Sequence, residues 1–155
     1  MQAWEKGRGR KMKGQSSLKG IKLGIVVSDF NREITSTMES HAEKTASSLG
    51  AAIGKKIHVH GAFEIPFAAK KLFEEKNIDA VIVLGAVIQG KTDHDVIIVS
   101  AVAPKLLELS LKFSKPLGFG IIGPRVTEKE AKSRAKEYAE RAVRAAFEMA
   151  KLNKK

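Results

Sequence analysis

The segment that decides the fold is DAVIVLGAVI, residues 79–88. Its single charge stands at the first position, and only apolar residues and one glycine follow. A strand with one face in water alternates apolar and polar residues, whereas a strand of a parallel sheet is covered on both faces and is apolar throughout. The segment therefore predicts a strand in the interior of a parallel sheet.

Strand and helix patterns alternate on both sides of this segment. Before it, the pattern predicts a strand over 21–27, a helix that carries Ile34 to Leu49, a strand near 55–60 and a helix near 65–76. After it, the pattern predicts a helix near 95–113 that is kinked or restarted at Pro104, a strand over 116–123, and a helix capped by Thr127 that runs to about 151. Such alternation builds three layers. We therefore expect an α/β fold of flavodoxin-like type, with a four-stranded parallel sheet and helices on both faces.

Composition is consistent with one soluble domain. A chain of 155 residues with 43% apolar residues can fill a single core, which we assign to residues 21–155. No apolar run approaches the roughly 20 residues that span a bilayer, and the chain does not open on a signal-peptide pattern, so we expect no membrane segment and a cytoplasmic location. Cysteine is absent, which excludes disulfides, thiol nucleophiles and thiolate metal sites.

The net charge of +11 raises nucleic acid as a partner, because clustered Lys and Arg release counterions from phosphate. Residues 1–20 hold six basic residues and one acidic residue, and they follow neither a helical nor a strand period. We expect them to form a basic, flexible N-terminal arm. Such an arm can aid solubility or assembly, or it can bind RNA.

Four loops gather the unusual residues of the chain. Parallel sheets of this type bind ligands beyond the carboxyl ends of their strands. Here those ends lead into residues 29–31, 61–65, 86–95 and 119–127. We expect a small-molecule site where these loops meet.

The third loop carries a candidate phosphate site. Gly90, Lys91 and Thr92 supply amides, an ammonium and a hydroxyl just before a helix N-terminus, where an anion is stabilised. The longer Walker pattern is missing, so ATP or GTP chemistry is not supported, and an ordinary turn is the alternative. His94 follows, and its imidazole can move protons near neutral pH.

The first two loops suit a flat, hydroxylated ligand. Phe30 and Asn31 combine an aromatic face with an amide, although a core phenylalanine and a helix-capping asparagine would have the same sequence. In the second loop Gly61 can turn the chain and expose the backbone that follows it. The carboxylate of Glu64, among apolar neighbours, then either belongs to a solvated turn or accepts hydrogen bonds from a polyol.

Two further groups of side chains leave alternatives open. His58 and His60 share a face by the period of a strand, but no third ligand has a compatible spacing, so we expect no metal site. Arg134, two turns into the last helix, can project a guanidinium toward a phosphate. Arg125 and Arg141 are competitors for this role, and a solvated helix face is the alternative.

With these residues in view, the chain resembles the 6,7-dimethyl-8-ribityllumazine synthases over about residues 21–151. Five segments in order carry the resemblance: GIVVSDFN (24–31), GAFEIP (61–66), LGAVIQGKTDH (84–94), KPLGFGII (115–122) and EKEAKSRA (128–135). Asp95 stands where many bacterial members have an aromatic residue, which is similar to the archaeal branch. The chain also lacks the glycine- and lysine-containing kink that bacterial members have in the last helix.

The resemblance implies a transferase of riboflavin biosynthesis. The family condenses 5-amino-6-(ribitylamino)uracil with 3,4-dihydroxy-2-butanone 4-phosphate to 6,7-dimethyl-8-ribityllumazine, phosphate and water, without a cofactor or metal. It also implies a homo-oligomer, either a pentamer or a 60-subunit shell, with sites shared between subunits. A related archaeal type of riboflavin synthase, which acts on two lumazines, and a basic RNA-packaging shell remain as alternatives.

The resemblance also assigns roles by position. His94 would be the proton donor and acceptor. Lys91, Thr92 and Arg134 would bind the butanone phosphate. The pyrimidine and its ribityl chain would be held by Phe30, Asn31, Ala62, Phe63, Glu64, the backbone of Ala86, Val87 and Ile88, and Phe119, the last from a neighbouring subunit.

Overall fold

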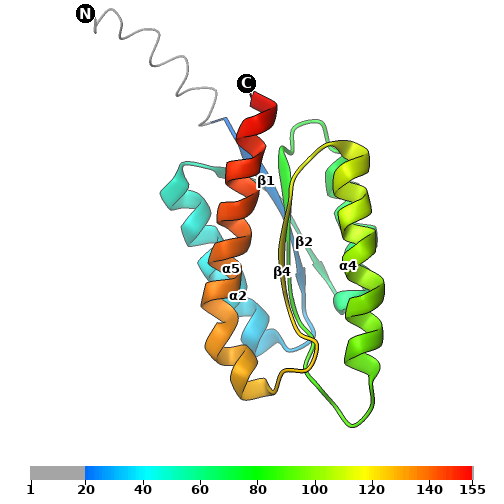
Figure 1. Ribbon diagram of the computed structural model, residues 1–155. Coiled ribbons are helices and arrows are strands. Elements are labelled where there is room, and N and C mark those ends of the chain that lie inside the picture. Colours follow the sequence, from blue (N-terminus) through cyan, green and yellow to red (C-terminus); the bar gives the residue numbers. More distant parts are fainter. Residues whose placement is uncertain (1–19, 155) are drawn as a thin grey trace, which may run out of the picture.

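A four-stranded sheet forms the middle layer of the computed structural model, which describes residues 20–154 (Figure 1). The predicted arm therefore lies, up to residue 19, outside the described residues. The strands pair in the order β2-β1-β3-β4, and every pairing is parallel. Their bounds are β1 (Lys22–Ser28), β2 (Ala52–Val59), β3 (Ala80–Ala86) and β4 (Leu117–Ile122).

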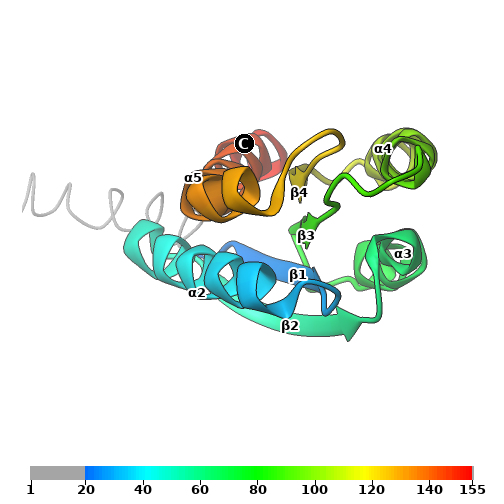
Figure 2. The ribbon, with the colours of Figure 1, turned by 90° about the horizontal axis from the view of Figure 1, so that it is seen from below.

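Four helices cover the two faces of the sheet. They are α2 (Arg32–Leu49), α3 (Ile65–Glu74), α4 (His94–Phe113) and α5 (Glu128–Ala150), with the short 3₁₀ helices η1 (Ala62–Glu64) and η2 (Lys151–Lys154). Seen along the strands, α2 and α5 lie on one face, and α3 and α4 lie on the other (Figure 2). Two separate apolar clusters match these two interfaces. The predicted three-layer, flavodoxin-like α/β architecture is confirmed.

The apolar segment 79–88 is where the sequence placed it. All seven residues of β3 are buried, and the strand pairs with β1 on one side and β4 on the other. The edge strand β2 is instead largely exposed. At the other edge, a side chain at Gly118 would come within 2.3 Å of the Ala142 carbonyl oxygen, so the glycine lets α5 approach β4 closely.

The helix ends follow the predicted signals, with one exception. Thr127 Oγ1 accepts a hydrogen bond from the Glu130 amide at 3.1 Å, and the Thr127 amide donates to Glu130 Oε1 at 2.9 Å, which confirms the capping box. The expected restart at Pro104 is wrong, because α4 is one helix from His94 to Phe113. Pro104 and Ser100 are both exposed, so water can satisfy the Ser100 carbonyl that the proline leaves without a helical donor.

The parallel pairing has one consequence for function. All four strands end at the same edge of the sheet, so the loops after Ser28, Val59, Ala86 and Ile122 are neighbours there. Within residues 20–154, no helix has the length and the apolar character needed to cross a bilayer.

Candidate active site

A cavity of about 630 Å³ opens at this carboxyl edge. It is lined from the loops after β1, β2 and β3 and from the first turns of α4 and α5. The sequence-predicted residues that line it are Phe30, Asn31, Ala62, Phe63, Glu64, Ala86, Val87, Ile88, Thr92 and His94. Three of the four expected loops therefore meet in one cavity.

The loop after β1 is held at several points. The amides of Asp29 and Phe30 donate to the carbonyl oxygens of Val59 and His60 at 2.7 and 2.9 Å. Phe30 is 63% exposed, so the interpretation as a core phenylalanine is wrong. Its ring lies 6.4 Å from the His60 ring, centroid to centroid, at a tilt of 54°.

Asn31 joins this loop to the central strand. It adopts a left-handed backbone conformation at the start of α2, with φ 62° and ψ 48°. Its side chain makes no capping hydrogen bond with the helix, and Nδ2 donates instead to the Ala86 carbonyl oxygen at 2.8 Å. The alternative of a helix-capping side chain is therefore wrong. A left-handed non-glycine residue costs about 1–3 kcal/mol, and asparagine tolerates it better than most residues.

Glu64 belongs to a turn and to the cavity at once. Its Oε1 accepts a hydrogen bond from the Gly61 amide at 3.0 Å, which starts η1, and the residue is exposed. The two interpretations of this carboxylate are thus compatible. The Gly61 amide sets its orientation, and Glu64 lines the cavity with carboxylate acceptor positions beyond the one that this amide occupies.

The backbone after β3 is partly used within the protein. The Val87 amide donates to the Ile122 carbonyl at 2.8 Å, and the Gln89 amide donates to the Val126 carbonyl at 2.8 Å. The Ala86 carbonyl already accepts from Asn31. These bonds fix the floor of the cavity against β4.

The loop before α4 and the first turn of that helix carry exposed side chains. The His94 amide donates to Thr92 Oγ1 at 3.3 Å, and both residues line the cavity and are exposed. Asp95, only 4% exposed, also lines the cavity, and its Oδ2 accepts from the Arg125 amide at 2.8 Å. Asp95 therefore ties the loop before α5 to α4, and its carboxylate is engaged by that backbone amide.

Three predicted residues do not line the cavity of their own chain. Lys91 is exposed on the loop before α4. Phe119 is 39% exposed on the edge strand β4. Arg134 is exposed on α5, and its guanidinium lies 3.9 Å from Glu137 Oε1.

Two lining residues escaped the sequence analysis, Ile98 and Glu128. Ile98 stands one turn after His94 on α4, so helical spacing from the histidine could have indicated it. Glu128 is the first residue of α5, directly after the capping Thr127. Its place next to the fourth loop was the available signal.

Beside the cavity, His58 is bonded to two carboxylates. Its Nδ1 lies 2.8 Å from Asp29 Oδ1 and its Nε2 lies 3.0 Å from Glu39 Oε2. The hydrogen bond with Asp29 has the largest effect and raises the pKa of His58; burial opposes it, and the bond with Glu39 adds to the rise. Across residues 20–154, no three His, Asp or Glu side chains group as metal ligands would.

Glu39 is the buried member of this cluster. Burial by itself would raise its pKa, but hydrogen bonds from Lys56 and His58 outweigh burial and leave the pKa below its ordinary value. Its Oε2 lies 3.0 Å from Lys56 Nζ, and its Oε1 lies 3.2 Å from a guanidinium nitrogen of Arg32. Several cations thus compensate one buried carboxylate.

Comparison with known proteins points in one direction. A family model described as 6,7-dimethyl-8-ribityllumazine synthase matches residues 20–154. The chain is similar to the protein of that name from Methanoculleus marisnigri, with 48% identity over 129 residues that cover 83% of this chain and 95% of the relative. Its likeness to the protein of that name from Methanocaldococcus jannaschii is 46% over 131 residues, or 84% of this chain and 92% of the relative.

A third relative comes from Saccharolobus islandicus and has the same name. It is 47% identical over 137 residues, which cover 88% of this chain and 89% of the relative. These relatives agree with the archaeal character that Asp95 indicated.

Proposed function

The chain belongs to the 6,7-dimethyl-8-ribityllumazine synthase family, and we propose that its carboxyl-edge cavity carries out the condensation of that family. The reaction joins 5-amino-6-(ribitylamino)uracil and 3,4-dihydroxy-2-butanone 4-phosphate, and releases phosphate and water. The observation that carries the proposal is the convergence of Phe30, Glu64 and His94 on one cavity from three different strands.

Recognition of the pyrimidine would fall on the β1 and β2 loops. The exposed ring of Phe30 offers a face for stacking, and Asn31 is held beside it by the Ala86 carbonyl. The turn Ala62–Glu64 would meet the ribityl chain, whose hydroxyls donate to a carboxylate that the Gly61 amide orients. Val87 and Ile88 would close the floor of the cavity around the ring edge.

Chemistry would fall on the opposite side of the cavity. Imine formation, phosphate elimination and ring closure each move protons, and His94 lines the cavity at the first turn of α4. Thr92, with Lys91, would hold the phosphate at this helix N-terminus, where the amides and the helix dipole favour an anion. Orientation of the two substrates would supply much of the remaining rate enhancement.

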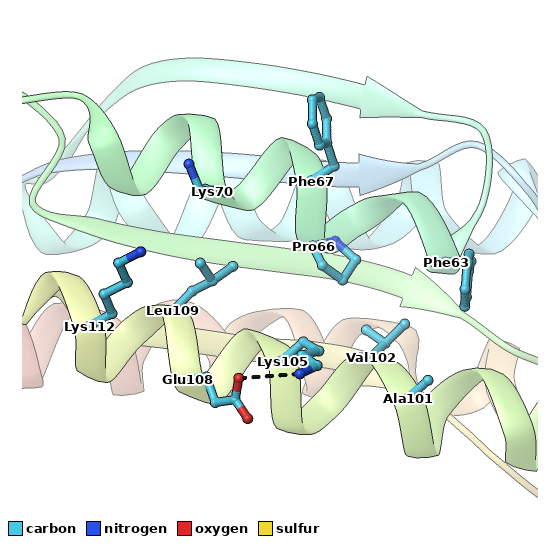
Figure 3. A pocket seen from close by; sticks show the side chains of 10 residues that line it. All are labelled: Phe63, Pro66, Phe67, Lys70, Ala101, Val102, Lys105, Glu108, Leu109 and Lys112. Carbon is cyan, nitrogen blue, oxygen red and sulfur yellow. Dashed lines mark ion pairs between the residues drawn. The ribbon is translucent and has the colours of Figure 1, made fainter.

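We further propose a homo-oligomer in which the site is completed by a neighbouring subunit. Support comes from Phe119 and Arg134, which are exposed and do not line the cavity of their own chain. Support also comes from a groove of about 640 Å³ between α3 and α4, lined by apolar side chains and lysine stems (Figure 3). Phe63 and Phe67 line this groove and are 61% and 72% exposed, and a contiguous exposed apolar patch marks an interaction site.

The assay for the first proposal is direct. Purified protein, incubated with both substrates and no added metal, should form the lumazine chromophore and release one phosphate per turnover. Absence of both products from correctly folded protein would overturn the proposal. The alternative of an archaeal-type riboflavin synthase predicts that lumazine is consumed instead of produced, and no comparison favours it.

A mixing experiment tests the shared site. Assemblies of His94→Ala alone or of Phe119→Ala alone should be impaired, whereas co-assembled subunits should recover activity because some sites then lack both changes. Failure to recover in mixed assemblies verified by native mass measurement would contradict a site shared through Phe119. The same mass measurement distinguishes a pentamer from a 60-subunit shell. We propose a cytoplasmic location for either assembly.

A further inference from the structure

The cluster around His58 lies against the loop that carries Phe30 and Asn31, and the proposed function does not use it. His58 is on the edge strand β2, Asp29 on the loop after β1, and Glu39 on α2. One imidazole therefore joins three elements. One of its two partners, Asp29, directly precedes Phe30 in the chain.

The geometry requires a charged imidazole. Both ring nitrogens face carboxylate oxygens, at 2.8 and 3.0 Å, and ionised carboxylates only accept hydrogen bonds. A neutral imidazole has one N–H and can donate to only one of them, which leaves a lone pair facing the other carboxylate. The double bridge thus forms with the imidazolium and breaks with the neutral ring.

Neighbouring charged groups decide which of the two carboxylates loses more when His58 becomes neutral. In the described chain, Arg32 and Glu43 of α2 and Lys56 of β2 lie next to the cluster. Glu39 is also bonded to Arg32 and Lys56, so it stays compensated when the imidazole becomes neutral.

Asp29 has much less support than Glu39. Apart from His58, its carboxylate has a guanidinium nitrogen of Arg32 at 3.7 Å, and its side chain is 49% exposed. A neutral imidazole keeps one N–H, but whichever carboxylate it bonds, Asp29 then has, among the described residues, only Arg32 at 3.7 Å as a nearby cation, whereas Glu39 keeps both Arg32 and Lys56. Neutralising His58 therefore weakens the hold on Asp29 more than the hold on Glu39. Asp29 belongs to the loop that also contains the cavity residues Phe30 and Asn31.

We propose that His58 is a positioning residue: its imidazolium fixes Asp29, and through it the pyrimidine-binding residues Phe30 and Asn31, so that the first substrate binds more weakly once the ring is neutral. The proposal rests on the proposed function for its substrate. It concerns binding of the pyrimidine and leaves proton transfer by His94 unchanged.

The direction with pH follows from the raised pKa of His58. The bridge is fully present below the ordinary histidine pKa of about 6.5, persists above it, and is lost as the pH rises through the raised folded value. KM for the pyrimidine should rise over that range, while kcat should not follow it.

Hydrogen exchange tests the bridge between His58 and Asp29 without any substrate. Protection of a peptide that contains Asp29 and Phe30, relative to the intrinsic exchange rate at each pH, should fall about three- to tenfold as the ring deprotonates. In His58→Gln the protection should be low at every pH. His41→Gln is the matched control, because His41 of α2 also faces a carboxylate at 3.9 Å, but that carboxylate is Glu140 of α5.

Steady-state kinetics tests what the His58 bridge does for substrate binding. In His58→Gln, KM for the pyrimidine should be raised about three- to tenfold at low pH and lose its dependence on pH in this window, with kcat within about twofold of wild type. Asp29→Asn should move the wild-type transition to lower pH, because the charge that stabilises the imidazolium is gone. His41→Gln should follow the wild type in both measurements.

Two outcomes would overturn the inference. One is an unchanged pH dependence of loop protection in His58→Gln. The other is a protection loss spread over all peptides, which marks a purely structural role. If wild-type protein makes no lumazine, the proposed function fails, but hydrogen exchange still decides whether the His58 bridge holds the loop. If the bridge holds the loop and KM for the pyrimidine does not change with pH, the positioning role of His58 fails and the proposed function stands.

Discussion

The two sides of the cavity are built differently. On the β1 side, Asp29, Phe30 and Asn31 are held by backbone bonds to the β2 end, by a side-chain bond to Ala86 and by the His58 bridge. On the α4 side, Thr92 and His94 are exposed, and the bond of the His94 amide to Thr92 Oγ1, at 3.3 Å, is long.

The difference matches the two tasks that we propose. Recognition of a rigid, flat ring gains from groups that are fixed before the ligand arrives, because less ordering is then needed on binding. A group that exchanges protons at several successive steps has to serve more than one geometry. We therefore expect changes on the α4 side to act on catalysis, and changes on the β1 side to act on binding and stability.

The largest effect should come from the α4 side. His94→Ala should lower kcat about 10²- to 10⁴-fold, because general acid–base transfer is removed. The melting temperature should change little, since the side chain is exposed. Steady-state kinetics and thermal unfolding on the same sample measure both. A large loss of stability would break the comparison.

Arg134 tests the proposed contribution of a neighbouring subunit to the site. Arg134→Ala should raise KM for the butanone phosphate about 10- to 100-fold, the effect of losing a charge-assisted contact to phosphate. Arg141→Ala is the matched control, because Arg141 lies on the same helix and pairs with the same Glu137, at 3.5 Å. Equal effects of the two substitutions would show that only the helix charge matters.

Stability should respond on the β1 side. Asn31→Ala should lower the free energy of unfolding by about 1–3 kcal/mol, because it loses the bond to the Ala86 carbonyl and keeps a left-handed backbone. Asn31→Gly, which relieves the backbone, should lose less. Denaturant titration measures both. Thr92→Ala, on the α4 side, should stay within about 0.5 kcal/mol of wild type.

The smallest effect concerns the acid side of the stability curve. The lowered pKa of Glu39 means that its stabilising contribution is present above the ordinary value of about 4.5 and is lost as the pH falls through the folded value. On acidification, the free energy of unfolding of Glu39→Gln should therefore fall by about 0.5–1 kcal/mol less than that of the wild type. Denaturant titrations at several pH values measure it, with Glu108→Gln on α4 as a surface control. Equal acid sensitivity of wild type and Glu39→Gln would rule this out.

Much of the fold was predictable because it follows local patterns. The apolar run in β3 indicates burial on both faces, and the Thr127–Glu130 box marks the start of α5 directly. A kink or a restart was predicted at Pro104, and the restart is wrong because the effect of proline depends on exposure. Residues 100 and 104 of α4 face solvent, so the lost backbone bond is tolerated.

Part of the candidate site was predictable for a similar reason. Parallel strands carry their following loops to one edge, so residues after different strands could be expected to meet. Lys91, Phe119 and Arg134 do not line the cavity within one chain. The proposed roles of Phe119 and Arg134 require a neighbouring subunit, and no local pattern encodes how subunits would be arranged.

His58 shows where sequence reasoning ends. Its spacing from His60 predicted a shared strand face and left open what the imidazole contacts. The sequence by itself determined the order of strands and helices, the edge where the cavity forms and the residues that line most of it, because periodicity and parallel pairing are local rules. Only the tertiary structure decided that Asp29 and Glu39 meet one imidazole, because that contact depends on how α2 packs over the β1–β2 edge.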